Sequence, residues 1–350
     1  MPKIKPKHKL NSTKQLLSWE FISLISFHNQ LNIISGIAFL GGNQVENLVA
    51  SKKSEKKNKN KLKTKKVVTG WAFIILPIGM IGLFYFYPMI QSLLLSFQSG
   101  SGVNLEYVGL DNYRRLLQDP TFLTATKNTL IFLIFQVPLM LILSIFFSTL
   151  LNQKALKLKG LFRTLIFLPS VTSLVAYSVI FKYLFSNNGI VNKILVNLSL
   201  IEDPILWLSD PFWAKVLIII AITWRWSGYN MIFFLSALQN IGPEIYEAAR
   251  IDGASSVQQF FKITVPLLKP VILFTSVTST IGTLQLFDEP MNITGGGTGN
   301  ATTTISQYIY NLSFKYTPDF GYAAAVSYAV VIMVIILSII QFKFGGKSND

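Results

Sequence analysis

Six long apolar runs constrain the fold of this chain more than any other feature of its 350 residues. A run of about 20 mainly apolar residues is long enough to cross a bilayer as a helix. A helix also satisfies its own backbone hydrogen bonds where no water is available. The sequence therefore predicts an all-α integral membrane protein, with Pro169 as a kink in the third span. The expected spans are 67–97, 128–151, 161–185, 212–238, 267–287 and 322–342.

The composition agrees with a membrane protein, because 51% of the residues are apolar and only 13% are charged. The chain contains no cysteine, which excludes disulfides, thiolate metal sites and thiol catalysis. Its two histidines, His8 and His28, both lie near the basic N-terminus. We therefore expect no catalytic residue and no metal site.

The positive charge is concentrated at the N-terminus, where 14 of the 31 lysines and arginines lie within residues 1–66. Basic segments beside membrane spans stay in the cytoplasm next to anionic lipid, and we favour that reading over nucleic-acid binding. Arg114, Arg115 and Lys127 fall outside the cell in the resulting topology, so the charge pattern fits it imperfectly. Cytoplasmic segments are then 152–160, 239–266 and the C-terminal tail, and external ones 98–127, 186–211 and 288–320.

Residues 1–66 are expected to form a basic cytoplasmic or interfacial extension before a six-span membrane domain at 67–345 and a cytoplasmic tail at 346–350. Residues 16–40 are apolar but interrupted by polar side chains. This pattern favours an amphipathic segment lying on the membrane surface, with an extra span as the alternative. The lysine-rich residues 52–66 are interpreted as a low-complexity linker.

The loop 239–266 contains a charged, amphipathic stretch between two spans. A short helix is expected from Pro243 to about Arg250, because Pro is favoured at the first helical position. Asp252 and Gly253 then tolerate a tight reversal.

A second short helix is expected at about 255–263, with Ser255 or Ser256 as its cap. One side of this helix should carry Val257, Phe260, Phe261 and Thr264. A helix–turn–helix exposed between spans is suited to contact with another protein.

This stretch also resembles the EAA loop of ABC-importer permeases, in particular the maltose- and glycerol-phosphate-type carbohydrate family. The resemblance rests on Glu247-Ala248-Ala249, Gly253, Ile263 and Val265-Pro266, together with Arg250-Ile251-Asp252, Ala254, Gln258 and Phe260. Further matches are FSNNGIVN from Phe185, Trp207-Leu208, Trp226 to Asn230, Thr294 to Gly297 and Gly321 to Ala325. The likeness covers roughly 67–345, and it departs from the family where Ile241-Gly242 replaces the usual Ile-Pro.

The resemblance implies a type I importer core of six transmembrane helices in a bacterial cytoplasmic (inner) membrane. It also implies a cytoplasmic coupling helix that docks on an ATPase subunit. The implied partners are a homologous second permease, two cytoplasmic ATPases, an extracytoplasmic solute-binding protein, a sugar or oligosaccharide cargo and membrane lipid. No cofactor is expected on this chain, since ATP and magnesium would bind the partner. The coupling residues would be Glu247, Ala248, Ala249, Asp252 and Gly253.

Two helix faces are candidates for the substrate path. Aromatic rings with a nearby amide suit a sugar, because its C–H faces stack on rings and its hydroxyl groups need hydrogen-bond partners. Ordinary packing of small and polar residues between spans is the alternative, and Gly282 fits it well. A charge within a span is costly, so Arg225 would meet Asp288, Glu289 or an acidic cargo group. The candidates are Trp226, Tyr229 and Asn230 in the fourth span, Ser279, Gly282 and Leu286 in the fifth, and Arg225.

The leading hypothesis is a transport subunit that performs no covalent chemistry and couples ATP hydrolysis by its partners to alternating access. A membrane-embedded glycan or lipid transferase is a second hypothesis, although no general base stands at a defined spacing. A stand-alone channel or secondary carrier is a third. The sequence leaves the cargo open between neutral and acidic sugars.

Overall fold

The computed structural model describes residues 42–101, 104–153 and 155–345. The chain divides into two compact units, Met1–Phe86 and Tyr87–Asp350. In the first unit, α2 (Gly42–Ile81) continues into a π-helical turn at Gly82–Phe86. The helix α2 runs through the lysine-rich segment, where the interpretation of residues 52–66 as a low-complexity linker had predicted no helix. The predicted surface segment at 16–40 lies outside the described residues.

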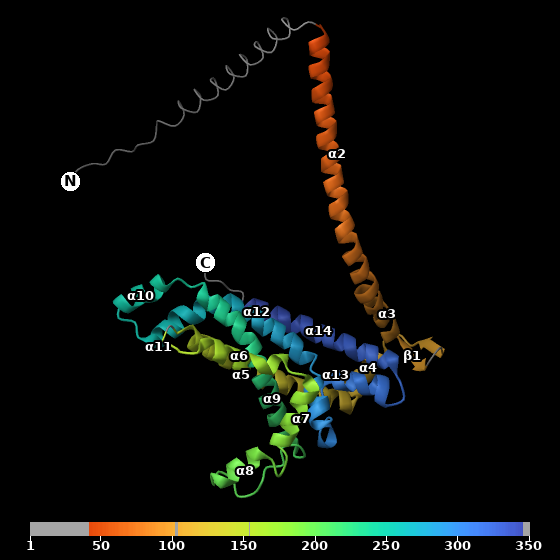
Figure 1. The fold of residues 1–350 in the computed structure, drawn as a ribbon. Coiled ribbons are helices and arrows are strands. Elements are labelled where there is room, and N and C mark those ends of the chain that lie inside the picture. The colour runs from red at the N-terminus through yellow and green to blue at the C-terminus, as the bar shows by residue number, and fades with distance from the viewer. Residues whose placement is uncertain (1–41, 102–103, 154, 346–350) are drawn as a thin grey trace, which may run out of the picture. The chain divides into compact units, whose positions relative to one another are not determined.

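The second unit is helical except for one small antiparallel hairpin (Figure 1). Its first part contains α3 (Tyr87–Ser96), β1 (Gln98–Ser101), β2 (Asn104–Tyr107), α4 (Asp111–Gln118), α5 (Pro120–Asn152), α6 (Lys159–Val171), α7 (Leu174–Leu184), α8 (Ile190–Asn197) and α9 (Pro211–Gln239). Its second part contains α10 (Pro243–Ile251), α11 (Ser256–Gln259), η2 (Phe260–Thr264), α12 (Val265–Leu284), η3 (Pro290–Thr294), η4 (Thr298–Asn300), α13 (Ile305–Tyr310), η5 (Asn311–Lys315) and α14 (Phe320–Gly345).

Five helical stretches of the described chain are long and apolar enough to cross a membrane, which confirms the all-α membrane fold. They are Lys66–Ser96, Pro120–Asn152, Pro211–Gln239, Ser256–Leu284 and Phe320–Gly345. The second of them begins earlier than the predicted 128, because Asp119 accepts hydrogen bonds from the first backbone N–H groups and Pro120 opens the helix.

The predicted third span is broken rather than merely kinked. Helices α6 and α7 are bent by 100° relative to each other, and the pair counts as a sixth span only if the two are taken together. The break at Thr172 and Ser173 lies just after Pro169, which remains inside α6. Proline removes a backbone donor and crowds the preceding turn, which weakens the helix at this point.

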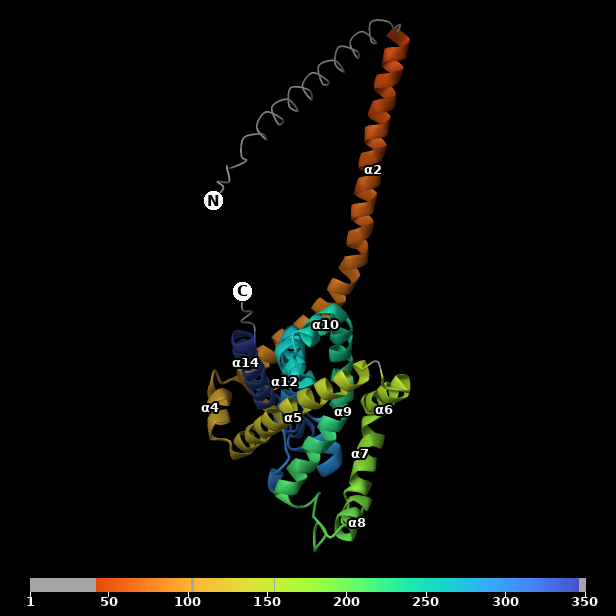
Figure 2. The ribbon, with the colours of Figure 1, turned by 90° about the vertical axis from the view of Figure 1, so that its left-hand side faces the viewer.

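The spans are held together by small and polar residues that allow close approach. The Ser144 hydroxyl of α5 donates to the Ser227 carbonyl of α9 at 2.9 Å. At Gly228, an added Cβ atom would overlap the Ile166 carbonyl oxygen of α6. Such contacts are typical of helix pairs in membranes. As a result, α5 and α6 both pack against α9 (Figure 2).

Candidate functional site

A pocket of about 230 Å³ lies between α5, α9 and α12. Six of the seven residues predicted for the substrate path line it, and Arg225 does not. The remaining lining residues come from α5, from further positions on α9 and α12, and from the segment that follows α12. The full lining is Gln136, Met140, Ile222, Trp226, Tyr229, Asn230, Thr278, Ser279, Gly282, Thr283, Gln285, Leu286, Phe287, Asp288 and Glu289.

The aromatic part of the pocket is formed by Trp226 and Tyr229 on α9. Their ring centroids lie 5.6 Å apart and the rings are nearly perpendicular, at 89°. Both side chains keep substantial accessible surface, 37% for Trp226 and 42% for Tyr229. Rings that are both fixed by an edge-to-face contact and accessible can offer an apolar face to a ligand.

The polar part of the pocket is organised around the thioether of Met140. The Gln136 and Asn230 amides contact its Sδ atom at 3.5 and 3.3 Å, and Ser279 Oγ lies 3.9 Å away. The Thr283 hydroxyl lies 3.0 Å from Gln136 Oε1. These contacts join side chains from three spans, so the amides and hydroxyls beside the pocket are held in defined positions. Sequence reasoning missed Gln136 and Met140, which carry no signal apart from polarity within an apolar run.

Gly282 does not serve close packing within this chain. An added Cβ atom would meet nothing within 4 Å, and the residue borders the pocket. The packing interpretation of Gly282 was therefore wrong for the described residues, and Gly228 makes the close approach instead. Leu286 is buried in an apolar cluster, and its carbonyl accepts a 2.6 Å hydrogen bond from the Thr304 hydroxyl.

Arg225 is buried, with 7% of its surface exposed. Its guanidinium carbon lies 5.3 Å from the centre of the Tyr177 ring and 5.9 Å from that of Trp226. Its Nε and Nη1 atoms have no hydrogen-bond partner, and the described part of the chain shows no ion pair from Arg225 to Asp288 or Glu289. Sequence reasoning named those two carboxylates as partners for Arg225, whereas the structure places both in the pocket wall.

The predicted coupling residues lie on the exposed pair of short helices formed by α10, α11 and η2 (residues 243–264), which we call the elbow. The elbow follows the C-terminal end of α9, and α8 lies near the other end of that helix (Figures 1 and 2). Helix α10 ends close to the predicted position, and Gly253 follows with φ +80°. The Gly253 N–H donates to the Arg250 carbonyl and the Ala254 N–H to the Ala249 carbonyl, at 3.1 and 2.9 Å. This pair of bonds is the Schellman arrangement, which requires a left-handed residue that glycine supplies at low cost. Glu247, Ala248, Asp252 and Gly253 are exposed, and Ala249 is half-buried.

The second half of the elbow begins with a complete capping box. Ser255 Oγ accepts from the Gln258 N–H, and the Gln258 side chain accepts from the Ser255 N–H. Three of the four residues predicted to share one side of this helix, Val257, Phe260 and Phe261, line a common cavity beside α5, and Thr264, at the end of a π-helical turn at Phe260–Thr264, does not line that cavity. Val257 and Phe261 are exposed, whereas Thr264 is buried and bonds to the Tyr246 hydroxyl at 3.0 Å. That bond fastens α10 to the base of α12.

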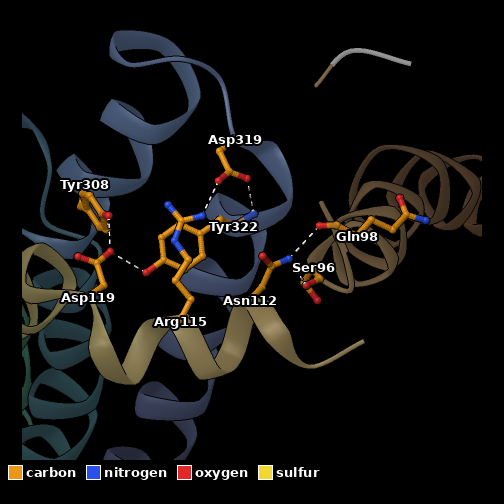
Figure 3. Close-up of polar contacts among 8 residues, drawn as sticks. All are labelled: Ser96, Gln98, Asn112, Arg115, Asp119, Tyr308, Asp319 and Tyr322. Atoms are coloured by element: carbon orange, nitrogen blue, oxygen red, sulfur yellow. Dashed lines mark hydrogen bonds and ion pairs between the residues drawn. The ribbon is translucent and has the colours of Figure 1, made fainter. Parts of the chain in front are cut away.

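A polar cluster missed by sequence reasoning joins the first turns of α5 and α14 (Figure 3). The Tyr308 and Tyr322 hydroxyls donate to Asp119 Oδ2, at 2.5 and 2.6 Å. Arg115 pairs with Asp319 at 2.7 Å and stacks over the Tyr322 ring at 3.8 Å.

At Asp119 the hydrogen bonds together lower the pKa by more than burial raises it. Burial alone would raise the pKa of this carboxyl, but the donated bonds from Tyr308, Tyr322 and two backbone N–H groups lower it below its ordinary value. The same contact, together with burial, raises the pKa of the Tyr308 hydroxyl. The cluster is therefore a fixed, charged tie between helix ends.

These features define a membrane transport subunit. Apolar helices of spanning length surround a pocket with aromatic and polar walls, and a rigid helical elbow is exposed beyond the spans. Residues 120–344 match the family described as "Binding-protein-dependent transport system inner membrane component". The chain belongs to this family.

Relatives and solved structures agree with this assignment. The lactose transport system permease protein LacF of Rhizobium radiobacter is 56% identical over 79% of this chain and 93% of its own length. The arabinooligosaccharides transport system permease protein AraP of Halalkalibacterium halodurans is 37% identical over 76% of this chain and 84% of its own. A chain of the bacterial alginate ABC transporter, solved in complex with an alginate pentasaccharide-bound periplasmic protein, superimposes with a TM-score of 0.65. Its sequence is 25% identical, and the match covers 77% of this chain and 91% of that one.

The predicted ABC-importer permease is thereby confirmed, and so is its place in the inner membrane. The chain is a permease component and not an enzyme, since the ATPase of these transporters is a separate subunit. The roles predicted for individual pocket and elbow residues remain predictions.

Proposed function

We propose that this chain forms half of the path by which an ABC importer carries a sugar or oligosaccharide, and that the pocket contacts the cargo. The observation that carries the proposal is the convergence of Trp226, Tyr229 and Asn230 with Ser279 and Gly282 on one cavity. Accessible rings suit the C–H faces of a sugar, and oriented amides and hydroxyls suit its hydroxyl groups. The names of the relatives support a sugar, and lactose is the first cargo to test.

A second, homologous permease completes the path in this proposal. Trp226, Tyr229 and Gly282 are accessible on helices of spanning length, and the pocket between them also has amide, hydroxyl and carboxylate groups in its wall. A polar wall open to lipid would be unfavourable, so another subunit is the physically reasonable cover. An extracytoplasmic solute-binding protein delivers the cargo on the side opposite the elbow.

The elbow couples the spans to a cytoplasmic ATPase, which binds ATP and magnesium. Glu247, Ala248 and Asp252 present an exposed surface next to a cleft of about 870 Å³ that α10 shares with the ends of α5 and α9. Because Tyr246 bonds to Thr264 at the base of α12, a push on α10 is transmitted to a span that lines the pocket. Alternating access would follow from movement of this lever.

The test is uptake of labelled lactose by the complete importer in proteoliposomes that contain ATP. Trp226→Ala should lower the uptake rate about tenfold, the equivalent of about 1.4 kcal/mol. Trp224→Ala is the matched control, because Trp224 lies on the same helix, is also partly exposed and stacks on Tyr177 away from the pocket. Equal rates for the two variants would contradict the pocket assignment. Uptake that persists without ATP would favour a secondary carrier.

A further inference from the structure

The pocket wall carries two carboxyl groups and, within the described part of the chain, no lysine or arginine. Asp288 and Glu289 lie between the end of α12 at Leu284 and the start of η3 at Pro290. Asp288 is half-buried, and Glu289 is only 3% exposed. A carboxylate buried to this degree beside a cavity is costly unless it has partners, so its retention needs a reason.

The surroundings of Glu289 offset part of the cost of burying its carboxyl group. Burial raises the pKa of this carboxyl, while its own backbone N–H and the positive charge of Arg225 act in the opposite direction. Arg225 is not part of the pocket lining, so its charge acts on Glu289 without facing the cavity wall. A ligand in the cavity therefore meets the carboxyl groups and not the guanidinium.

Carboxyl groups select for one class of sugar. They accept hydrogen bonds from hydroxyl groups, and charge-assisted bonds of this kind are stronger than neutral ones. In their ionised form they also repel a carboxylate, sulfate or phosphate on the cargo, because like-charge contact in a desolvated site is unfavourable. A pocket built for an acidic glycan would instead expose arginine or lysine, the usual partners of anionic groups.

We propose that Asp288 and Glu289 are specificity-determining residues that bind hydroxyl groups of a neutral sugar and exclude anionic sugars such as uronates and sugar phosphates. This inference rests on the proposed function and names its substrate class. Family membership does not decide between a neutral and an acidic sugar, because the proteins named above include both a lactose permease and a transporter of alginate, an acidic polysaccharide.

The experiment compares two probes in the reconstituted importer. One is lactose, and the other is the analogue in which a carboxylate replaces the C6 hydroxymethyl group of galactose. The affinity of the solute-binding protein for each probe is measured separately, and uptake is recorded with that protein saturated, so that its own selectivity does not enter. The wild type should carry lactose much faster than the uronate.

The double variant Asp288→Asn with Glu289→Gln should reduce lactose uptake and raise the uronate-to-lactose ratio about tenfold. The matched control is Glu202→Gln with Asp203→Asn, which removes the same two charges from exposed neighbouring positions in an external loop. The control should leave the ratio unchanged. If the double variant fails to fold, Asp288→Asn alone, at the half-buried position, should shift the ratio in the same direction.

An unchanged ratio in the pocket variants would overturn the inference, and so would a wild type that carries the uronate as fast as lactose. Either result leaves the sugar-import function intact, because lactose is still taken up. A wild type that carries neither probe when the binding protein is loaded would count against the proposed function itself and against the inference that rests on it.

Discussion

Asp119 concentrates several stabilising contacts on one carboxylate. It caps α5 by accepting from the Thr121 and Phe122 N–H groups, and it also accepts from two tyrosine hydroxyls (Figure 3). The tyrosines belong to α13 and α14, more than 180 residues further along the chain. This residue therefore ties together helix ends that the sequence gives no reason to pair.

Asp119→Ala should destabilise the protein by about 2–3 kcal/mol, about 1 from the lost cap and the rest from the lost charge-assisted bonds. Asp210→Ala is the matched control. Asp210 caps α9 through the same two kinds of backbone bond, so its replacement should cost only about 1 kcal/mol. Reversible unfolding in mixed micelles measures both values, and equal losses would contradict the role given to the tyrosines.

The lowered pKa of Asp119 determines how the stability difference between the wild type and Asp119→Ala depends on pH. The carboxyl titrates near 3.8 in its ordinary state and below that in the fold. Its contribution is therefore complete above about pH 4 and is lost as the pH falls through the folded pKa. The stability gap between wild type and Asp119→Ala should be constant from pH 5 to 8 and should narrow in acid, and a gap that widened in acid would contradict this reading.

Two glycines of the spans separate packing from transport. Gly228→Ala places a Cβ atom against the Ile166 carbonyl of α6, so the helices must move apart at a cost of about 1–3 kcal/mol. Gly282→Ala meets open space in the pocket and should leave stability unchanged or raise it by up to about 1 kcal/mol. It should nevertheless slow sugar uptake, because the methyl group enters the cavity. A loss of stability in the Gly282 variant, with none at Gly228, would reverse the assignment.

At the scale of whole elements, run length and capping residues predicted the positions of most helices, whereas the angles between helices depend on tertiary contacts. Apolar run length located the spans, and the Pro243, Gly253 and Ser255 signals placed the elbow helices within a few residues. The 100° break after Pro169 could not be inferred, because a proline marks a weak point without fixing the angle. The helix through the lysine-rich segment was missed because its charge density suggested a linker.

The candidate pocket also combines features that helical spacing predicts with features that depend on how the helices pack. Helical spacing correctly grouped Trp226, Tyr229 and Asn230, and separately Ser279 and Gly282, on faces that the structure brings together. Spacing could not reveal that Met140 contacts residues of both faces, or that Arg225 is absent from the pocket lining, since both depend on how the helices pack. The carboxyl groups of Asp288 and Glu289 were visible in the sequence, but their position in the pocket wall was not.

At the scale of the whole molecule, the spans have surfaces that this chain does not cover. Apolar side chains such as Ile332, Ile335 and Ile339 of α14 are exposed, as expected for contact with lipid or with another subunit. The exposed elbow has a mixed surface, in which charged and small residues alternate with exposed apolar side chains such as Ile251, Val257 and Phe261. The two surfaces therefore suit different surroundings, a membrane and an aqueous protein partner.

The central claim is that this elbow lies on the cytoplasmic side and is held by an ATPase. The chain has no cysteine, so Ala248→Cys introduces a single reactive thiol at an exposed position of α10. Labelling by a membrane-impermeant maleimide should occur in inside-out vesicles stripped of the ATPase, and adding the ATPase back should suppress it. Asp203→Cys, in the external loop, should react only in intact cells stripped of the outer envelope. Labelling of Ala248→Cys from the outside, or at the same rate with and without the ATPase, would contradict the account.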